Sequence, residues 1–238
     1  MFSSIVKLGI NDSNITYMIP ILTLDGPSGV GKGTVASIIA QKLDWHLLDS
    51  GAIYRAFAIV ARDNDIKIDD IDDLLKLANN FDISFKLNSN HEPLNVYLNN
   101  VEVSSELRTE KTAALASQFA KIESLRKVLL VKQRQFKKLP GLVADGRDMG
   151  TVVFPDAPFK VFLTAEVEER AKRRLKQLQE RGITGNISHT LAEVQKRDER
   201  DANRQHSPLR PAKDALVIDT TNLAINEVIA KVMALIKA

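Results

Sequence analysis

Short apolar runs alternate along the chain with stretches of helical periodicity. The expected strands are Ile19–Leu24, His46–Leu48, Leu142–Ala144, Phe159–Leu163 and Leu216–Ile218. The expected helices are Gly31–Leu43, Ala52–Asp63, Ile122–Lys137, Ala165–Glu180, Thr190–Asn203 and Leu223–Lys237. This alternation predicts an α/β fold, in which a mostly parallel sheet carries helices on both faces. The strands are largely apolar, which fits burial on both of their sides.

One region departs from this rhythm. Three strand-like pieces, Asp82–Leu87, Asn95–Leu98 and Val101–Val103, follow one another too closely for parallel connections. A polar turn is expected at Asn88–Pro93, and the pair Asn99–Asn100 is a candidate two-residue hairpin. We therefore expect a small antiparallel β subdomain, inserted between helices of the larger fold.

A glycine-rich segment, GPSGVGKGT, runs from Gly26 to Thr34 between the first expected strand and the first expected helix. In this context the free N–H groups and dipole of the helix, together with Lys32, would hold the phosphates of a nucleotide. The common pattern ends in Gly-Lys-Ser/Thr, whereas here Gly33 follows the lysine and displaces the hydroxyl by one place. The simpler alternative is a tight turn that serves no ligand.

Polar residues also gather where two other strands end. The segment Leu47–Arg55 reads LLDSGAIYR, in which Ser50 would donate to a phosphate or, like Asp49, begin a helix as its cap. The segment 141–151 carries Asp145 at the end of its strand. Asp145 would either orient Mg²⁺ through water or form a hydrogen bond with the glycine-rich segment. These positions predict a site at the carboxyl edge of the sheet.

The same strand end carries two neighbouring opposite charges, Arg147 and Asp148. They would either face a ligand or pair with each other.

The region from Arg170 to Arg200 is strongly basic and contains two glycines near its middle. Arg197, Asp201 and Arg204 follow at helical spacing and share one face of the expected helix. One interpretation is a solvated helix with a loose turn and surface ion pairs. The other is a lid that closes over phosphates, because several guanidinium groups on one face suit a highly anionic ligand.

Composition narrows the choice of function. Lysine and arginine total 33 against 30 aspartates and glutamates, and this near balance gives no reason to expect bulk binding to nucleic acid or to anionic membranes. The 238 residues include no cysteine, which excludes disulfides and thiolate chemistry, and the four histidines are scattered. Residues 1–18 lack the pattern of a signal peptide and are expected to form a flexible leader. No apolar run is long enough for a membrane span, so residence in the cytoplasm is the default expectation.

Four segments together resemble the bacterial cytidylate kinases, members of the nucleoside monophosphate kinase family of P-loop phosphotransferases. They are GPSGVGKGT at 26–34, LLDSGAIYR at 47–55, VADGRDMGTVVFPDAP at 143–158 and KRDERD at 196–201. Adenylate kinases share the first segment but not the other three. The resemblance extends from about Pro20 to the end of the chain, and it includes the inserted strands, which enlarge the monophosphate-binding domain of this family.

The resemblance implies a three-layer P-loop fold with a parallel central sheet, an inserted small antiparallel β subdomain and a short lid. The core would comprise residues 19–60, 138–169 and 205–238. Residues 61–137 would form the monophosphate-binding domain, with its inserted strands at 82–103. Residues 170–204 would form the lid and the arginine-bearing helix.

The implied reaction is phosphorylation of CMP and dCMP by ATP with Mg²⁺, giving CDP and dCDP. A kinase of UMP or AMP, or a P-loop ATPase module that transfers nothing, is the alternative. The expected partners are therefore nucleotides, with neither nucleic acid nor membrane, and the expected state is a monomer. Which residues would hold the metal is left open.

Site residues follow from the resemblance position by position. The ATP phosphates would lie on Gly26, Pro27, Ser28, Gly29, Val30, Gly31, Lys32, Gly33 and Thr34. The expected catalytic residues are Lys32, Arg147, Arg197 and Arg204. The acceptor phosphate would be bound by Ser50, Arg55, Arg147 and Arg204. Arg197 and Asp201 would lie at its ribose and phosphate, and Ser117, Arg126 and Asp148 would face the cytosine.

Overall fold

A computed structural model of the chain describes residues 18–86, 94–180, 182–203 and 207–237. Its larger sheet has five strands in the order β2, β6, β1, β7, β8, and every neighbouring pair is parallel. These strands are β1 (Ile21–Asp25), β2 (His46–Asp49), β6 (Leu142–Gly146), β7 (Phe159–Thr164) and β8 (Leu216–Asp219). The predicted parallel sheet is confirmed, and all five strands lie within a residue or two of their expected positions.

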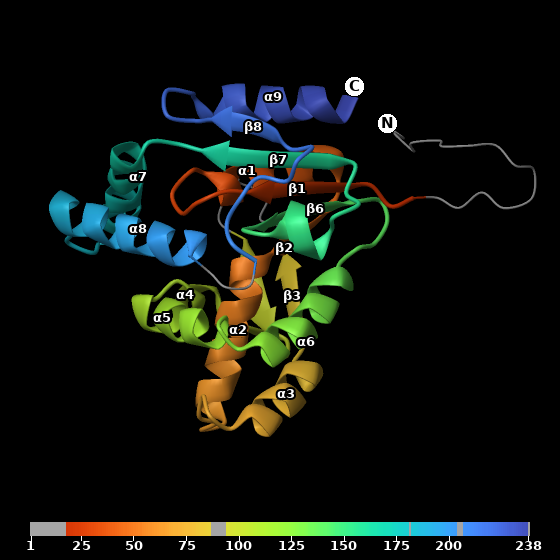
Figure 1. Cartoon of the computed structure of the whole chain (residues 1–238), viewed down its shortest axis with the longest axis vertical. Helices are drawn as coiled ribbons and strands as arrows, with labels where there is room; N and C mark the ends of the chain where they lie inside the picture. The colour runs from red at the N-terminus through yellow and green to blue at the C-terminus, as the bar shows by residue number, and fades with distance from the viewer. Residues whose placement is uncertain (1–17, 87–93, 181, 204–206, 238) are drawn as a thin grey trace, which may run out of the picture.

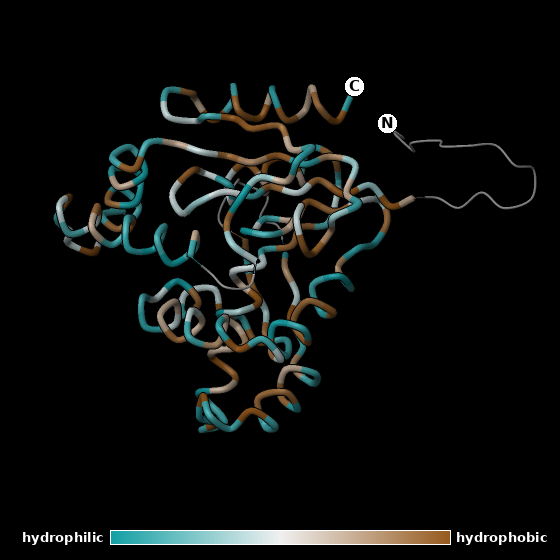
Figure 2. Tube along the Cα trace, viewed as in Figure 1, coloured by the Kyte–Doolittle hydropathy of each residue, from teal (hydrophilic) through white to brown (hydrophobic). Residues whose placement is uncertain are grey.

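Both faces of this sheet are buried. Leu22 and Leu24 of β1 pack on one side against α1 (Lys32–Leu43) and α9 (Ile225–Lys237). Ile21 faces the opposite side, as the two-residue period of a strand requires, and joins the core under α2 (Ser50–Asp63) and α6 (Glu123–Arg134). The strands at the centre of Figure 2 are accordingly hydrophobic along most of their length.

The inserted antiparallel subdomain is also confirmed. Its three strands, β3 (Ile83–Lys86), β4 (Asn95–Leu98) and β5 (Val101–Glu102), pair in chain order. Asn99 and Asn100 link β4 to β5 with φ angles of 48° and 66°. Positive φ at both positions is the geometry of the two-residue turn that the sequence predicts. The expected polar turn at Asn88–Pro93 lies outside the described residues.

Three helices that precede or follow this small sheet in the chain were not predicted: α3 (Ile71–Asn80), α4 (Ser104–Leu107) and α5 (Glu110–Phe119). They complete the lower part of the molecule in Figure 1. Leu74 and Ala78 of α3 are buried, and Leu75 and Leu77 pack partly buried against the same core, so the helix has a clear apolar face. This face packs against the long helices α2 and α6, and that packing stabilises a helix of only 10 residues.

The basic region forms two helices, α7 (Val167–Gln179) and α8 (Ile187–Ala202). Helix α8 begins three residues earlier than expected, because the side chain of Asn186 accepts hydrogen bonds from the backbone N–H groups of Ser188 and His189. Figure 1 shows both helices beyond the carboxyl ends of the strands, with α8 above α4 and α5. No helix in the described part of the chain is long and apolar enough to cross a membrane.

Candidate active site

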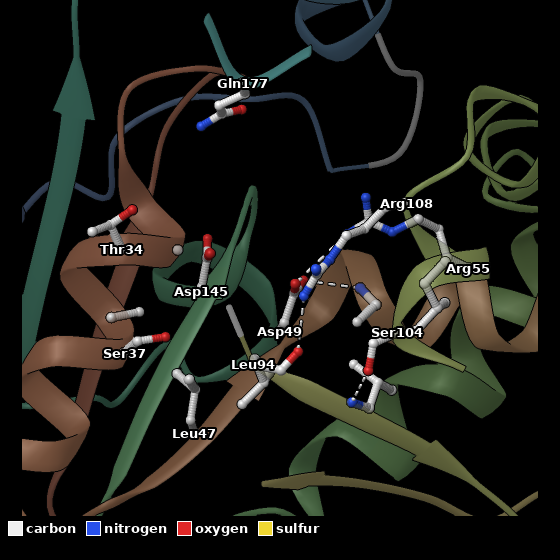
Figure 3. A pocket seen from close by; sticks show the side chains of 15 residues that line it. Thr34, Ser37, Leu47, Asp49, Arg55, Leu94, Ser104, Arg108, Asp145 and Gln177 are labelled. Carbon is white, nitrogen blue, oxygen red and sulfur yellow. Dashed lines mark hydrogen bonds and ion pairs between the residues drawn. The ribbon is translucent and has the colours of Figure 1, made fainter. Parts of the chain in front are cut away.

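The register of the sheet brings several chemically active strand ends to one edge. Asp145 of β6 lies opposite Leu24 of β1 and Asp49 of β2, so three loops begin side by side. Figure 3 shows Asp49 and Asp145 in one hollow, with Thr34 of α1 on the same side as Asp145. The carboxyl edge of the sheet is therefore where the site is built, as parallel strands favour.

The glycine-rich segment is a tight turn that leads straight into α1. Gly26, Gly29 and Gly31 have φ angles of 146°, 83° and 92°, which side chains rarely adopt. A Cβ on Gly26 would lie 2.1 Å from the carbonyl oxygen of Leu163, so only glycine fits there. Because the turn opens the N-terminus of a 12-residue helix, it presents free N–H groups at the same place. The tight-turn and anion-binding interpretations are therefore compatible.

Lys32, which is buried, and Asp145, which is half-buried, form the floor of the site. The ammonium group of Lys32 donates to the carbonyl oxygen of Pro27 at 2.7 Å. Burial, assisted by the charge of Arg147, lowers the pKa of Lys32 to about 7. Burial also raises the pKa of Asp145 to about 7, because it outweighs the opposing effect of the Lys32 charge.

The neighbouring charges Arg147 and Asp148 do not pair with each other, so that alternative is wrong. Arg147 donates through Nε to Asp201 of α8 at 2.8 Å and through Nη1 to the carbonyl of Gly26 at 2.5 Å. Asp148 instead accepts a hydrogen bond from Arg126 of α6 at 2.8 Å. The two residues thus connect the strand end to two different helices.

Asp25, at the end of β1, fixes the backbone of that same segment. Its carboxylate accepts from the N–H groups of Met149 and Gly150, both at 2.8 Å, at the start of a π-helical turn (Met149–Val153). Burial raises the pKa of Asp25 to about 6 although these two bonds oppose the shift.

The start of α2 combines a cap with a cation. The side chain of Asp49 accepts from the N–H of Ala52 at 2.9 Å, so the predicted cap is confirmed for Asp49. Arg55 lies one turn further on, with its Nη2 3.6 Å from the other carboxylate oxygen of Asp49. The Nε of Arg55 is buried without a hydrogen-bond partner among the described residues. A buried, unsatisfied donor of this kind points to a ligand that accepts from it.

These side chains surround a cavity of about 380 Å³ between the sheet, α5 and α8. Predicted residues that line it are Ser28, Gly29, Gly31, Lys32, Gly33, Thr34, Ser50, Arg55, Ser117, Arg126, Arg147, Asp148 and Arg197. A smaller hollow of about 240 Å³, drawn in Figure 3, adjoins it and shares Thr34, Asp49 and Asp145. Cations from distant parts of the chain therefore meet in one place.

A few predicted residues lie elsewhere. Gly26, Pro27 and Val30 shape the loop without being among the described residues that line the cavity. Asp201 is buried behind Arg147. Arg204 lies outside the described residues.

Arg197 lines the cavity, and burial together with the positive charge of Arg147 lowers its pKa to about 10.

Some cavity residues were not singled out from the sequence: Tyr54, Arg108, Glu110, Arg174 and Gln177. Arg108 donates to the carbonyl of Leu94 at 3.3 Å and brings a further guanidinium from the junction of α4 and α5. The sequence offers no signal for it, because neither helix was predicted. Arg174 belongs to the basic stretch, and its ion pair with Glu110 joins α7 to α5 across the cavity.

The residues present suit a Mg²⁺ ion that is held jointly by the protein and by the phosphates of a nucleotide. Among the described residues, no three acidic or histidine side chains are grouped as a metal-binding cluster. The carboxylates of Asp49 and Asp145 and the hydroxyl of Thr34 nevertheless line the same hollow. Mg²⁺ keeps several waters and commonly takes one or two carboxylates plus substrate phosphates, so this set of oxygens fits it.

A glycine loop that opens a helix at the edge of a parallel sheet, opposite a group of cations, defines a P-loop phosphotransferase. Residues 22–238 match the protein family described as Cytidylate kinase. The chain belongs to the cytidylate kinase family. This membership confirms the predicted activity, phosphorylation of CMP and dCMP, and with it the use of a nucleotide donor.

The chain was also compared with curated proteins and with solved structures. A cytidylate kinase of Aeromonas salmonicida (strain A449) is 51% identical over 217 residues, which span 91% of this chain and 94% of the relative. One of Colwellia psychrerythraea (strain 34H / ATCC BAA-681) is 51% identical, spanning 90% and 94%. A solved shikimate kinase from Bacteroides thetaiotaomicron aligns over 93% of this chain and all of its own, at 12% identity and a TM-score of 0.45.

Proposed function

We propose that the cavity holds ATP and a cytidine monophosphate end to end, and that the residues around it transfer the γ-phosphoryl group between them. The observation that carries this proposal is the convergence of Lys32, Arg55, Arg147 and Arg197 on one cavity beside the glycine loop. Two facing phosphate groups repel each other, so bringing them into line requires several cations.

The donor phosphates would lie on the loop from Gly26 to Thr34. Their negative charge competes with the carbonyl of Pro27 for the ammonium of Lys32, which then follows the moving phosphoryl group. An oxygen of the CMP phosphate forms a bond to the γ-phosphorus as the bond to ADP breaks. Lys32, Arg147, Arg197 and Arg204 would stabilise the charge on the transferring group.

The acceptor would be held by the residues that α2 and the strand ends provide. Its phosphate would accept from Ser50 and from the unsatisfied Nε of Arg55, and Arg147 lines the same cavity. The resemblance adds Arg204 to this group. Arg197 and Asp201 would contact the ribose and phosphate. Ser117, Arg126 and Asp148 would contact cytosine, whose amino group is the donor that an aspartate prefers.

Mg²⁺ would be held by Asp145 and Asp49, directly or through water, together with the phosphates. Its chemistry is to neutralise charge on the donor phosphates. Asp145 lies close to the start of α1, since a Cβ on Gly33 would be 3.6 Å from its carboxylate oxygen. This position is compatible with both of the roles that the sequence leaves open for Asp145.

Three larger units would carry out the reaction. We assign the core to residues 19–60, 138–169 and 205–238, the monophosphate-binding domain to 61–137 and the lid to 170–204. We further propose a monomer that works in the cytoplasm on nucleotides, with no nucleic-acid or membrane partner. The near balance of charges supports the last point.

A coupled assay of ADP release, run across CMP, dCMP, UMP and AMP, tests the proposal. We expect turnover with CMP and dCMP that far exceeds turnover with UMP and AMP. Equal rates with UMP, or ATP hydrolysis that is independent of any acceptor, would contradict it.

A further inference from the structure

Two arginines from separate parts of the chain hold the backbone of the glycine loop. Arg147 donates to the carbonyl of Gly26 at 2.5 Å, and Arg170 donates to the carbonyl of Ser28 at 3.2 Å. The carbonyl of Pro27, between them, accepts from Lys32. Three successive carbonyls of the loop are therefore bonded to cations.

Each of these two arginines also pairs with an aspartate of α8. Arg147 bonds Asp201 at 2.8 Å, and Arg170 forms two bonds to Asp198, at 3.0 and 2.6 Å. The two aspartates are three residues apart and so share one face of the helix. Helix α8, which carries Arg197 into the cavity, is thus attached to the loop at two points through arginine bridges.

The Arg170–Asp198 pair does not belong to the nucleotide cavity itself. Neither residue is among the described residues that line that cavity. Arg170 is only 5% exposed and also donates through Nε to the carbonyl of Ala165. The two hydrogen bonds between buried Arg170 and half-buried Asp198 hold the two side chains in a defined orientation.

Helix α7 also packs directly against the glycine loop. A Cβ on Gly29 would lie 3.0 Å from the Cβ of Arg170 and 3.1 Å from its carbonyl oxygen. The first turn of α7 and the loop are therefore closely packed at Gly29. Through Asp198, this close contact extends to α8.

We propose that Arg170 and Asp198 are positioning residues that couple α8 to the glycine loop, so that Arg197 and Asp201 reach the nucleotides in register with Lys32. The inference rests on the proposed function for its catalytic consequence. The mechanical coupling between α8 and the loop is independent of which nucleotide is phosphorylated.

The first test removes the charge of Asp198 with little change in shape. In Asp198→Asn we expect hydrogen exchange of the backbone amides at 26–34 to accelerate, although the substitution lies on another helix. Glu199→Gln is the matched control, since it makes the same carboxylate-to-amide change at the next, exposed position. Exchange in the loop that equals the wild-type rate in Asp198→Asn would overturn the coupling.

The second test separates positioning from folding. Replacing a buried ion pair by apolar side chains often preserves stability, so Arg170→Met combined with Asp198→Leu is expected to unfold near the wild-type temperature. We expect this double variant nevertheless to lose kcat for CMP by roughly 10- to 100-fold, because reacting groups are misplaced. A double variant with a near-native Tm and wild-type kcat would overturn the inference.

The two proposals fail in different ways. If the wild-type protein does not phosphorylate CMP, the proposed function is wrong, and the coupling is then decided by the exchange measurement alone. If the wild-type protein is active and the variants behave as it does in both measurements, the function stands and the coupling is wrong.

Discussion

Arg126 and Asp148, which are 22 positions apart in the chain, form an ion pair of 2.8 Å at the wall of the cavity. Both side chains are largely buried, and the guanidinium of Arg126 also lies 5.9 Å from the centre of the Tyr54 ring. A single bond from Arg126 leaves Asp148 with capacity to accept a further hydrogen bond from a ligand.

Base selectivity should depend on that remaining capacity. Cytosine offers an amino donor where uracil offers a carbonyl, so a carboxylate acceptor attracts the first and repels the second. We expect Asp148→Ala to lower the ratio of kcat/KM for CMP to that for UMP, by up to roughly 10⁴-fold. Asp156→Ala, an exposed aspartate of the following turn, is the control. An unchanged ratio in Asp148→Ala would reject this assignment.

Lys32 should matter for turnover far more than for folding. In phosphoryl transfer a cation that acts on the transition state is worth roughly 10³–10⁵ in kcat, taking arginine fingers as the guide. We therefore expect Lys32→Ala to lower kcat by a factor in that range, with the Tm close to that of the wild type. Lys42→Ala, on the exposed side of the same helix, should be fully active. Near-normal turnover in Lys32→Ala would show that the lysine has no such role.

The lowered pKa of Lys32 predicts that nucleotide binding takes up protons. With a pKa of about 7, most of the lysine is neutral at pH 8 in the free protein. A phosphate beside it favours the charged form and raises its pKa, so a proton is taken from solution. Titration calorimetry in buffers of different ionisation enthalpy measures this uptake. Asp145 also titrates near pH 7, so the informative quantity is the difference between the wild type and Lys32→Ala, and equal uptake in both would contradict the prediction.

How much of this site the sequence predicts depends on the distance over which residues interact. The glycine loop and the Asp49 cap are local, since each is specified by a strand, a turn and a helix start within a few residues. The pairs Arg147–Asp201 and Arg170–Asp198 join positions 54 and 28 residues apart, and no spacing rule relates them. The sequence therefore predicts which charges exist near the site but not which of them hold one another.

For the fold, the strands were predicted more completely than the helices. Apolar strands that are buried on both faces were located to within two residues, because their hydrophobic runs leave few alternatives. Helix α3 was missed although Leu74, Leu75 and Ala78 give it an apolar face at helical spacing. Arg108 was missed for a different reason, since the one-turn helix α4 that leads to it has almost no periodicity.

Asp25 should make stability depend on pH in a defined window. Its pKa rises from 3.8 to about 6 on folding, so the folded chain holds this proton more tightly than the unfolded chain. The resulting contribution is complete below pH 3.8 and is lost as the pH rises through 6, a change on the order of 3 kcal/mol. Asp25→Asn removes this titration, so the wild type should lose stability relative to the variant between pH 4 and 7.

Urea unfolding of both proteins across that range measures the difference, with Asp72→Asn, an exposed change on α3, as the control. A difference that stays constant with pH would show that Asp25 titrates as it does in the unfolded chain. Independently, kcat should fall in Asp25→Asn. Met149 and Gly150 donate to different carboxylate oxygens of Asp25, and the amide replaces one of these oxygens by an NH2 group that cannot accept, so the segment that carries Arg147 loses a support.

We expect the proposed lid, residues 170–204, to close over both nucleotides. The ion pair between Arg174 of α7 and Glu110 of α5 already spans the cavity, and residues 182–186, at the tip of the proposed lid, are exposed. A filled cavity adds phosphates that attract Arg174 and Arg197, so the tip should be held more firmly. Limited digestion with a protease of broad specificity should therefore cut near Gly182–Asn186 more slowly when a non-hydrolysable ATP analogue and CMP are both present. Because either nucleotide alone supplies only part of the phosphate charge, partial protection is expected from each. Equal cutting in all four conditions would mean that the lid does not respond to its ligands.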